Sequence, residues 1–403
     1  MASHRVSRAI FAIICARGSQ TRGILSLNLV PELTGPYKVG TTVLELVDYG
    51  RPDPFAPTGP RDLVVSLFYP TAEDACEQFK LAPQFPPKTA AYYDAQTNAT
   101  GKIAETITTR AYLGAPLVRP DLPLLLLSPG FGGPRLFYSD YAEELASDGW
   151  NVVTVDHPWD APFVEYPDGR VVESNLSAIV VAGGVLNDII LDPFLYPRVA
   201  DLVFVLDSLA NNSIVSLIPG LGYASRKQGL QTHSVGVVGG SFGGAAAYEV
   251  MATDERFKVG VNLDGELFGP ARFQEADSPF LFLAALDHNY TLDTSWREAW
   301  QRHRGFKRIF AVNGTEHSGF TDWPVFRDLL GDRFPATNVV GEIGSTNGTT
   351  ILSIERAFTK AFFDRFLKGY GGELLDGEGL DLWPEVTWIK EPPAQDLYNT
   401  TEG

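Results

Sequence analysis

The 403-residue sequence has few cysteines and few basic residues, and both shortages exclude classes of protein. Cys15 and Cys76 are its two cysteines, too few for a disulfide-rich scaffold or a thiolate metal cluster. Lys and Arg number 32 against 49 Asp and Glu, which leaves a net charge of −17. This charge argues against a nucleic-acid partner, which needs a basic surface, and against electrostatic attraction to anionic membranes.

Long hydrophobic runs are also missing. The most apolar segment, Leu176 to Leu191, contains two glycines, an asparagine and an aspartate, and it is shorter than the ~20 residues of a spanning helix. Apolar residues make up 44% of the chain and charged residues 20%, the balance of a soluble globular protein. We therefore expect a protein that folds around its own core and has no obligate protein partner.

The N-terminus and the asparagines point to export. Basic residues at positions 4, 5 and 8 precede an apolar run from Ala9 to Ala16, the pattern of a short signal peptide over residues 1–16. Seven of the thirteen asparagines lie in Asn-x-Ser/Thr sequons, which are glycosylated only in the secretory pathway. They are Asn98, Asn175, Asn211, Asn289, Asn313, Asn347 and Asn399. We expect a secreted glycoprotein.

From Leu122 onward, short apolar runs alternate with helical patterns. This alternation predicts an α/β fold with a mostly parallel, doubly wound sheet and helices on both faces. Two earlier strands, 41–47 and 63–69, are expected to extend one edge of the sheet in antiparallel fashion. The later strands are expected at 122–127, 151–155, 235–238, 257–263, 279–286 and 308–312, and the helices at 138–148, 198–209, 242–251, 295–303 and 351–367.

We expect a single domain from about residue 30 to 390, with a loose acidic tail at 391–403. The stretch from Pro158 to Pro197 interrupts the alternation and is a candidate lid over the carboxyl edge of the strands. The apolar segment 176–191 and five aromatic residues of this stretch are expected to cover the mouth of a site. The aromatic residues are Trp159, Phe163, Tyr166, Phe194 and Tyr196.

One segment indicates chemistry. Residues 235–245 read as a buried strand, then Gly-x-Ser-x-Gly, then the start of a helix rich in small residues. In a nucleophile elbow the serine has a strained backbone, so its neighbours must be small. The bare motif is also compatible with a packing turn. Its place between a Val-rich strand and a helix favours Ser241 as a nucleophile.

A serine nucleophile needs a base, and the chain has six histidines. His317 follows the strand expected at 308–312, in a polar loop 76 residues after Ser241 (317 − 241), where this fold supplies its base. His288 also follows a strand and stays open as an alternative, although a surface turn fits it as well. The others precede the elbow or lie in a helical pattern: His4, His157, His233 and His303.

The tetrahedral intermediate carries negative charge that backbone amides stabilise. The residue after the nucleophile, Phe242, supplies one N–H group. The Gly-rich loop Ser128–Gly133 follows the strand at 122–127, and Phe131 is the candidate for the second donor. The alternative for this loop is a simple connection.

The Gly-x-Ser-x-Gly motif, the Gly-rich loop and the loop of His317 together resemble those of the platelet-activating factor acetylhydrolases, or group VII phospholipases A2, within the α/β hydrolases. The resemblance implies Ser241 as nucleophile, His317 as base, and Phe131 and Phe242 as amide donors. The family usually has histidine before the nucleophile, whereas this chain has Gly240. The matching segments are Gly35–Gly40, Arg61–Pro70, Ser128–Gly133, Val155–Pro158, Gly239–Gly244 and Gly314–His317.

Two aspartates compete for the role of the acid that orients the histidine. Asp264 ends the strand after the elbow helix, and Asp287 ends the next strand. Many α/β hydrolases, polyester hydrolases included, take their acid after the later strand. The acetylhydrolase pattern takes it about 23 residues past the serine, which matches Asp264 (264 − 241). We therefore predict Asp264.

The sequence predicts a serine esterase without cofactor or metal, since no His or Cys pair shows metal-ligand spacing. With the resemblance, we expect hydrolysis of short or oxidatively truncated sn-2 acyl groups of glycerophospholipids, independent of calcium, with weak apolar contact to a lipid interface. Two alternatives stay open: a cutinase-like or polyester-degrading lipase, and a non-catalytic α/β-hydrolase that serves as a binding protein.

Overall fold

The computed structural model describes residues 28–56, 58–97, 103–184, 186–222, 229–334 and 343–390. The expected signal peptide at 1–16 and the tail at 391–403 lie outside these residues. Within the described ranges, no helix is both long and apolar enough to cross a membrane.

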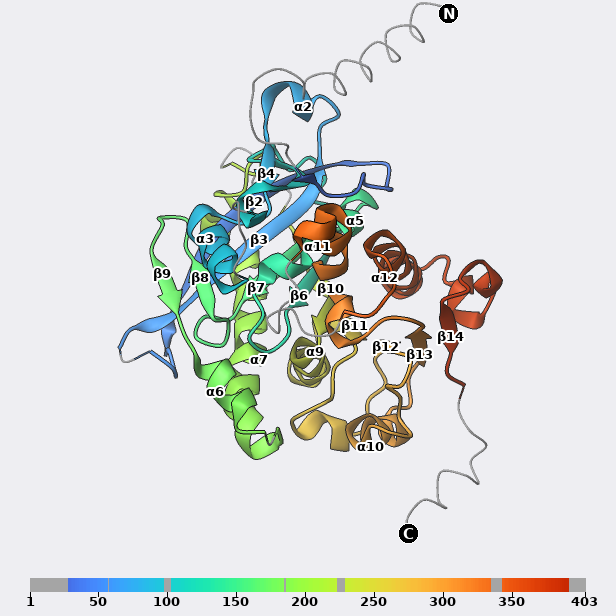
Figure 1. The fold of residues 1–403 in the computed structure, drawn as a ribbon. Helices are drawn as coiled ribbons and strands as arrows, with labels where there is room; N and C mark the ends of the chain where they lie inside the picture. Colours follow the sequence, from blue (N-terminus) through green and yellow to red (C-terminus); the bar gives the residue numbers. More distant parts are fainter. Residues whose placement is uncertain are drawn as a thin grey trace, which may run out of the picture.

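A mixed 12-stranded sheet forms the centre of the molecule (Figure 1). Its order is β1-β5-β2-β3-β7-β6-β10-β11-β12-β13-β14, with β4 beside β5. The strands from β7 to β13 are parallel, β2 and β3 form the expected antiparallel edge extension, and β14 is antiparallel to β13. The strands are β1 (Asn28–Leu29), β2 (Lys38–Pro52), β3 (Pro60–Thr71), β4 (Leu81–Pro83), β5 (Ile107–Leu113), β6 (Pro123–Ser128), β7 (Asn151–Asp156), β10 (Gln231–Gly240), β11 (Phe257–Leu263), β12 (Phe280–Ala285), β13 (Lys307–Val312) and β14 (Val386–Trp388).

Helices cover both faces of this sheet, which confirms the α/β-hydrolase architecture expected from the sequence. The helices α5, α11 and α12 share one apolar cluster, and α7 and α9 share the cluster of the opposite face. The helices are α2 (Ala75–Gln78), α3 (Pro87–Gln96), α4 (Ile103–Thr106), α5 (Ser139–Ser147), α6 (Leu176–Ala182), α7 (Asp188–Ala210), α8 (Asn212–Val215), α9 (Phe242–Thr253), α10 (Thr294–Arg302), α11 (Trp323–Leu330) and α12 (Gly348–Phe363).

Strand β6 shows why the parallel strands read as continuous apolar runs. Leu124 and Leu126 belong to the cluster with α7 and α9, whereas Leu125 and Leu127 belong to the cluster with α5 and α12. Successive side chains of a strand point to opposite faces, and both faces are covered here. All four leucines are fully buried, and each such burial stabilises the fold by about 1.5–3 kcal/mol.

The candidate lid is made of three pieces. A small antiparallel hairpin of β8 (Phe163–Glu165) and β9 (Val171–Glu173) is followed by α6 and by the first turns of α7. The helix α7 begins at Asp188, not at Arg198 as expected, and it includes Pro193 and Pro197. The two prolines lie four residues apart, so the positions without an N–H group fall on one face of the helix. Packing of the buried face of α7 keeps the helix continuous through both prolines.

Candidate active site

Ser241 lies in a sharp turn between β10 and α9. Its φ of 52° and ψ of −123° are unusual for a residue with a side chain. The turn requires glycine nearby: a Cβ atom on Gly239 would lie 1.9 Å from the carbonyl oxygen of Gly243. The strained strand–turn–helix geometry is that of a nucleophile elbow, and it presents the serine side chain beyond the carboxyl end of the sheet.

The structure brings Ser241, His317 and Asp264 into one hydrogen-bonded line. His317 lies in a 3-10 turn after β13, with its Nε2 atom 2.8 Å from Ser241 Oγ. Its Nδ1 atom is 2.7 Å from Oδ2 of Asp264, which directly follows β11. Asp287, the rival acid, is exposed on the loop after β12 and forms no hydrogen bond with the other described residues. The arrangement supports the choice of Asp264; its role in catalysis stays a prediction.

Asp264 is held as a carboxylate. It is buried, has a φ of 55°, and its Oδ1 atom accepts a hydrogen bond of 2.7 Å from the backbone N–H of Ala285. Burial opposes its ionisation, but hydrogen bonds from His288 and His317 outweigh this and lower its pKa. An ionised Asp264 can orient His317 and stabilise the imidazolium that forms when Ser241 loses its proton.

The two predicted amide donors flank the serine. Phe242 is the first residue of α9, and Phe131 lies in the loop after β6 with glycine on both sides. Phe131, Ser241 and Phe242 line the same cavity. A Cβ atom on Gly130 would lie 3.3 Å from the Cβ of Ser241, so the loop passes close to the nucleophile. Neither amide N–H has a hydrogen-bond acceptor among the described residues, so both can donate to an oxyanion.

Two buried residues that the sequence analysis missed fix this loop. Arg198 of α7 donates to the carbonyl oxygens of Pro129 and Gly130, the latter at 3.0 Å. Asp160 accepts from the backbone N–H of Gly132 at 2.9 Å and pairs with Arg198 at 2.6 Å. Both side chains are almost fully buried, so their hydrogen bonds hold the Phe131 amide in place without solvent competition.

A second Ser–His–Asp arrangement lies beneath the loop. His157 contacts Ser128 Oγ through Nε2 at 2.9 Å and Asp201 through Nδ1 at 2.8 Å, and Arg61 pairs with Asp201 at 2.7 Å. Each of these side chains is at most 1% exposed, so no substrate reaches them. Burial lowers the pKa of His157. We interpret this group as a support of the loop, and its signal in the sequence is the Val155–Pro158 segment.

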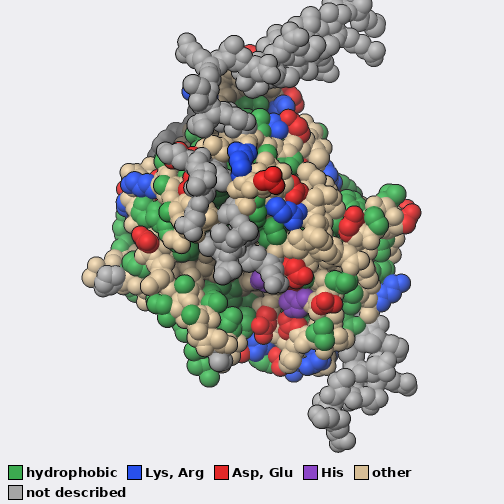
Figure 2. Space-filling model, viewed as in Figure 1, with side chains coloured by type: hydrophobic (Ala, Val, Ile, Leu, Met, Phe, Trp, Pro, Cys, Tyr) green, Lys and Arg blue, Asp and Glu red, His purple; other side chains and the backbone are tan. Residues whose placement is uncertain are grey.

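A cavity of about 520 Å³ opens at Ser241. The candidate lid contributes Leu186 and Leu191 to its lining. None of the five aromatic residues expected at the mouth lines this cavity, so that expectation is wrong. Phe163 stacks on Tyr92, and the Tyr166 hydroxyl donates to the carbonyl oxygen of Asp62, because β8 and β9 pack against β2 and β3. Figure 2 shows histidine and acidic side chains gathered in one area, with apolar side chains beside them.

Position 240, where the sequence departs from the pattern of the related family, is filled by another side chain. A Cβ atom on Gly240 would lie 2.1 Å from the hydroxyl oxygen of Tyr138. Tyr138 is buried and therefore occupies the space that a larger residue 240 would need.

No group of three His, Cys, Asp or Glu in the described ranges could hold a metal ion.

A family model, curated proteins and a solved structure resemble this chain over most of its length. The family model described as "Platelet-activating factor acetylhydrolase, isoform II" matches residues 23–167 and 210–363. A "Probable 1-alkyl-2-acetylglycerophosphocholine esterase" of Arthroderma benhamiae is 30% identical, covering 94% of this chain and 98% of its own. A "Platelet-activating factor acetylhydrolase" of Cavia porcellus is 24% identical, covering 89% and 84%. Among solved structures, a ferulic acid esterase from Streptomyces cinnamoneus has a TM-score of 0.74 and 32% identity, covering 90% and 99%.

Proposed function

The chain belongs to the platelet-activating factor acetylhydrolase family, and from this premise we propose that its Ser241–His317–Asp264 line hydrolyses short acyl esters of glycerophospholipids. The protein is a carboxylic ester hydrolase. The observation that carries the proposal is the continuous line of hydrogen bonds from Ser241 through His317 to Asp264, 2.8 Å and 2.7 Å long. This line lies at the carboxyl ends of parallel strands, in a chain that matches the family model.

The reaction follows from the geometry. Ser241 Oγ attacks the ester carbonyl while Nε2 of His317 takes its proton, and Asp264 holds the resulting imidazolium. The carbonyl oxygen becomes an oxyanion within reach of the Phe131 and Phe242 amides, each of which is worth about 2.7–4 kcal/mol in such sites. His317 then protonates the leaving alcohol, and water releases the acyl group by the reverse sequence. No step needs a cofactor or calcium.

The substrate we propose is a glycerophospholipid with a short or oxidatively truncated sn-2 acyl group. The named relatives support the acetyl ester of a glycerophosphocholine. Each added methylene changes transition-state binding by only ~1–3 kcal/mol, so discrimination between neighbouring chain lengths is expected to be modest.

The test is hydrolysis of acetyl, butyryl and long-chain phosphatidylcholines with a chelator present. We expect the acetyl and butyryl esters to react fastest, Ser241→Ala to abolish the reaction, and Ser353→Ala on the exposed face of α12 to leave it unchanged. Faster turnover of long chains, or activity confined to polyester films and triglycerides, would indicate the lipase or cutinase alternative.

A second candidate substrate class is the ester of a hydroxycinnamic acid. The ferulic acid esterase structure, which this chain covers almost completely at 32% identity, favours it. Methyl ferulate assayed beside the phospholipids decides between the two: a larger kcat/KM for the aryl ester would favour this class. A fluorophosphonate probe that fails to label Ser241 would favour a non-catalytic binding protein.

We also propose contact with lipid interfaces beside the site. The helix α6, the start of α7 and the segment between them expose five large apolar side chains: Ile179, Val181, Leu186, Ile189 and Ile190. The family model leaves out residues 168–209, which contain this patch. With a net charge of −17, contact would rest on apolar burial, so added salt should weaken it little.

Export and glycosylation are proposed from the sequons. Of the five sequon asparagines in the described ranges, Asn175, Asn211, Asn313 and Asn347 are exposed and Asn289 is half-buried. Asn98 and Asn399 lie outside the described residues. Mass spectrometry of the exported protein before and after endoglycosidase treatment tests the proposal.

A further inference from the structure

His288, which lies on the loop after β12, contacts the same carboxylate as His317. Its Nδ1 atom is 2.9 Å from Oδ1 of Asp264, and its Nε2 atom is 2.7 Å from Oδ2 of Asp293. The ring stacks on Trp296, with centroids 4.1 Å apart. Trp296 is itself buried and donates through Nε1 to the carbonyl of Gly265 at 2.6 Å. The imidazole is therefore held on three sides.

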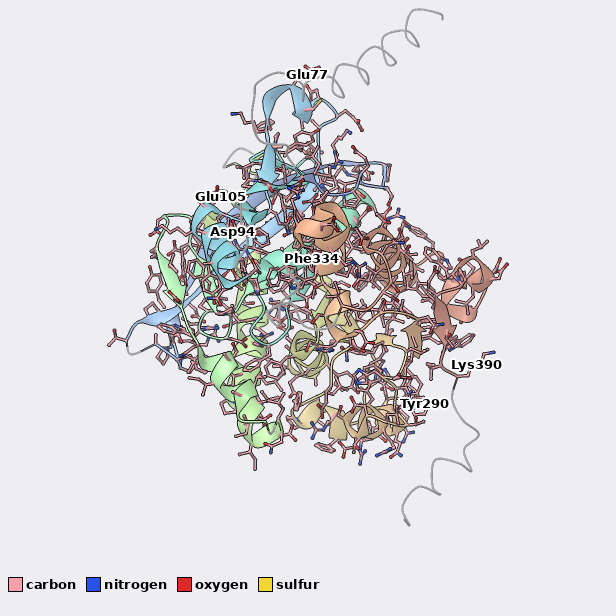
Figure 3. All side chains as sticks on the ribbon, viewed as in Figure 1. Glu77, Asp94, Glu105, Tyr290, Phe334 and Lys390 are labelled. Atoms are coloured by element: carbon pink, nitrogen blue, oxygen red, sulfur yellow. The ribbon has the colours of Figure 1, made fainter. Side chains whose placement is uncertain are left out.

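The loop that holds His288 is anchored. Tyr290 is buried, and its ring stacks on that of Trp300, with the centroids 5.3 Å apart. Its hydroxyl donates to the carbonyl oxygen of Lys390 at 2.9 Å, and Tyr290 and Lys390 lie near each other in Figure 3. The contact between His288 and Asp264 is thus part of the packed structure of this loop.

These contacts determine the charge of His288. A neutral imidazole has one N–H group and can donate to only one carboxylate. Here each ring nitrogen faces a carboxylate oxygen. The same oxygen of Asp264 also accepts the backbone N–H of Ala285, and the other oxygen of Asp293 accepts the backbone N–H groups of Ser295 and Trp296. Both contacts are satisfied together only by an imidazolium. Burial opposes this charge, but Asp264 and Asp293 outweigh it and raise the pKa of His288 to about 9.

We propose that His288 is a positioning residue whose positive charge offsets that of Asp264, so that His317 remains an unprotonated base down to a lower pH than a bare Ser–His–Asp triad would allow. The inference rests on the proposed function, because it takes His317 as the base. Its physical basis is that one carboxylate serves two imidazoles, His317 on Oδ2 and His288 on Oδ1. A carboxylate already paired with a cation attracts a second proton onto His317 less strongly.

Other charges near His288 are few. Asp293 precedes α10 and forms the pair already described. Glu266, which follows β11, and Asp287, which precedes His288, are exposed, so water screens them. Arg272 is paired with Asp188 and Glu298 and does not line the cavity. The Asp264–His288 pair is therefore the charged neighbour of His317 that is most shielded from solvent.

The decisive variant is Asp293→Asn. Asn caps a helix as well as Asp does, so the start of α10 is retained. Its amide N–H can donate to Nε2 of a neutral His288, whose Nδ1–H still donates to Asp264. The charge disappears while the hydrogen bonds remain. We expect the acid limb of kcat/KM for p-nitrophenyl acetate to move to higher pH by roughly 0.5–2 units. His288→Gln should move it in the same direction.

The matched control is Asp254→Asn, which removes the same charge at the far end of α9, where Asp254 pairs with Arg256, and should leave the limb in place. A merely structural role of His288 would lower activity at all pH values without moving the limb. An unmoved limb, or one that moves to lower pH, overturns the inference.

Imidazole ¹⁵N NMR of the full chain tests the charge independently of activity, with His288 assigned by comparison with His288→Gln. Two protonated nitrogens at pH 7.5, reduced to one in Asp293→Asn, support the inference. A neutral His288 in the unsubstituted chain overturns it. If no ester is hydrolysed at all, the proposed function fails, and the NMR result still decides the charge of His288.

Discussion

Replacing Asp264 with Asn tests the acid of the triad, and the structure predicts how the amide would sit. The Oδ1 position accepts hydrogen bonds from the Ala285 N–H and from His288, so the amide oxygen must stay there. The amide nitrogen then faces Nδ1 of His317, 2.7 Å away in the unsubstituted protein. It would donate to that nitrogen and force the tautomer whose Nε2 carries the hydrogen. Nε2 could then no longer accept the proton of Ser241.

A wrong tautomer of this kind costs about 10⁴ in kcat, or roughly 5.5 kcal/mol of transition-state stabilisation. We expect this loss for Asp264→Asn with p-nitrophenyl acetate, together with slower fluorophosphonate labelling of Ser241. The exposed Asp287, changed to Asn, should retain kcat within about twofold. Circular dichroism and thermal melting of both variants check that the fold is intact. A large loss in Asp287→Asn with activity retained in Asp264→Asn would refute the assignment.

Three further predictions follow from contacts outside the triad. Arg198→Lys keeps the charge but cannot bond both loop carbonyls, so kcat should fall at least tenfold while KM changes less; an unchanged kcat would show that the Phe131 loop needs no such support. Burial raises the pKa of Glu143 to about 8, so its stabilising contribution is complete below its unfolded pKa near 4.5 and is lost as pH rises through 8. The melting temperature should therefore drop by a few degrees from pH 5 to pH 8.5, and Glu143→Gln should make this drop smaller. An equal drop in the variant and the unsubstituted protein would show that Glu143 does not cause it. Ile189 is 84% exposed, so Ile189→Glu should weaken binding to phosphatidylcholine vesicles about tenfold and spare hydrolysis of monomeric esters, while Leu382→Glu, a 77% exposed control elsewhere, should do neither.

The sequence predicted the central strands well because they are buried on both faces. The runs at 257–263 and 151–155 differ from β11 and β7 by at most one residue. The strand β5 was missed because its sequence, Ile-Thr-Thr-Arg-Ala-Tyr-Leu, is half polar and its partners β1, β2 and β4 come from other segments of the chain. The start of α7 was missed because prolines normally end a helix, and only packing could show that this one continues.

For the site, chain order was enough to select Ser241, His317 and Asp264 as candidates, since each follows a parallel strand of the predicted sheet. Chain order could not show that His288 reaches Asp264, because that contact depends on how the loop after β12 folds back. Nor could it place Arg198 and Asp160 beneath the Phe131 loop. These contacts join residues 24 and 38 positions apart and have no local pattern.

The positive φ angles of Ser241 and Asp264 bear on whether the chain is under selection to catalyse. Side chains at such angles cost of order 1–3 kcal/mol each, and glycine would relieve that cost. At position 264 glycine would also remove the acceptor of the Ala285 N–H and of His288, whereas the Ser241 side chain forms a hydrogen bond only with His317 among the described residues. A lineage that used this fold only to bind would therefore gain stability from glycine at position 241. Serine at that strained position is a destabilising choice that the proposed hydrolysis explains.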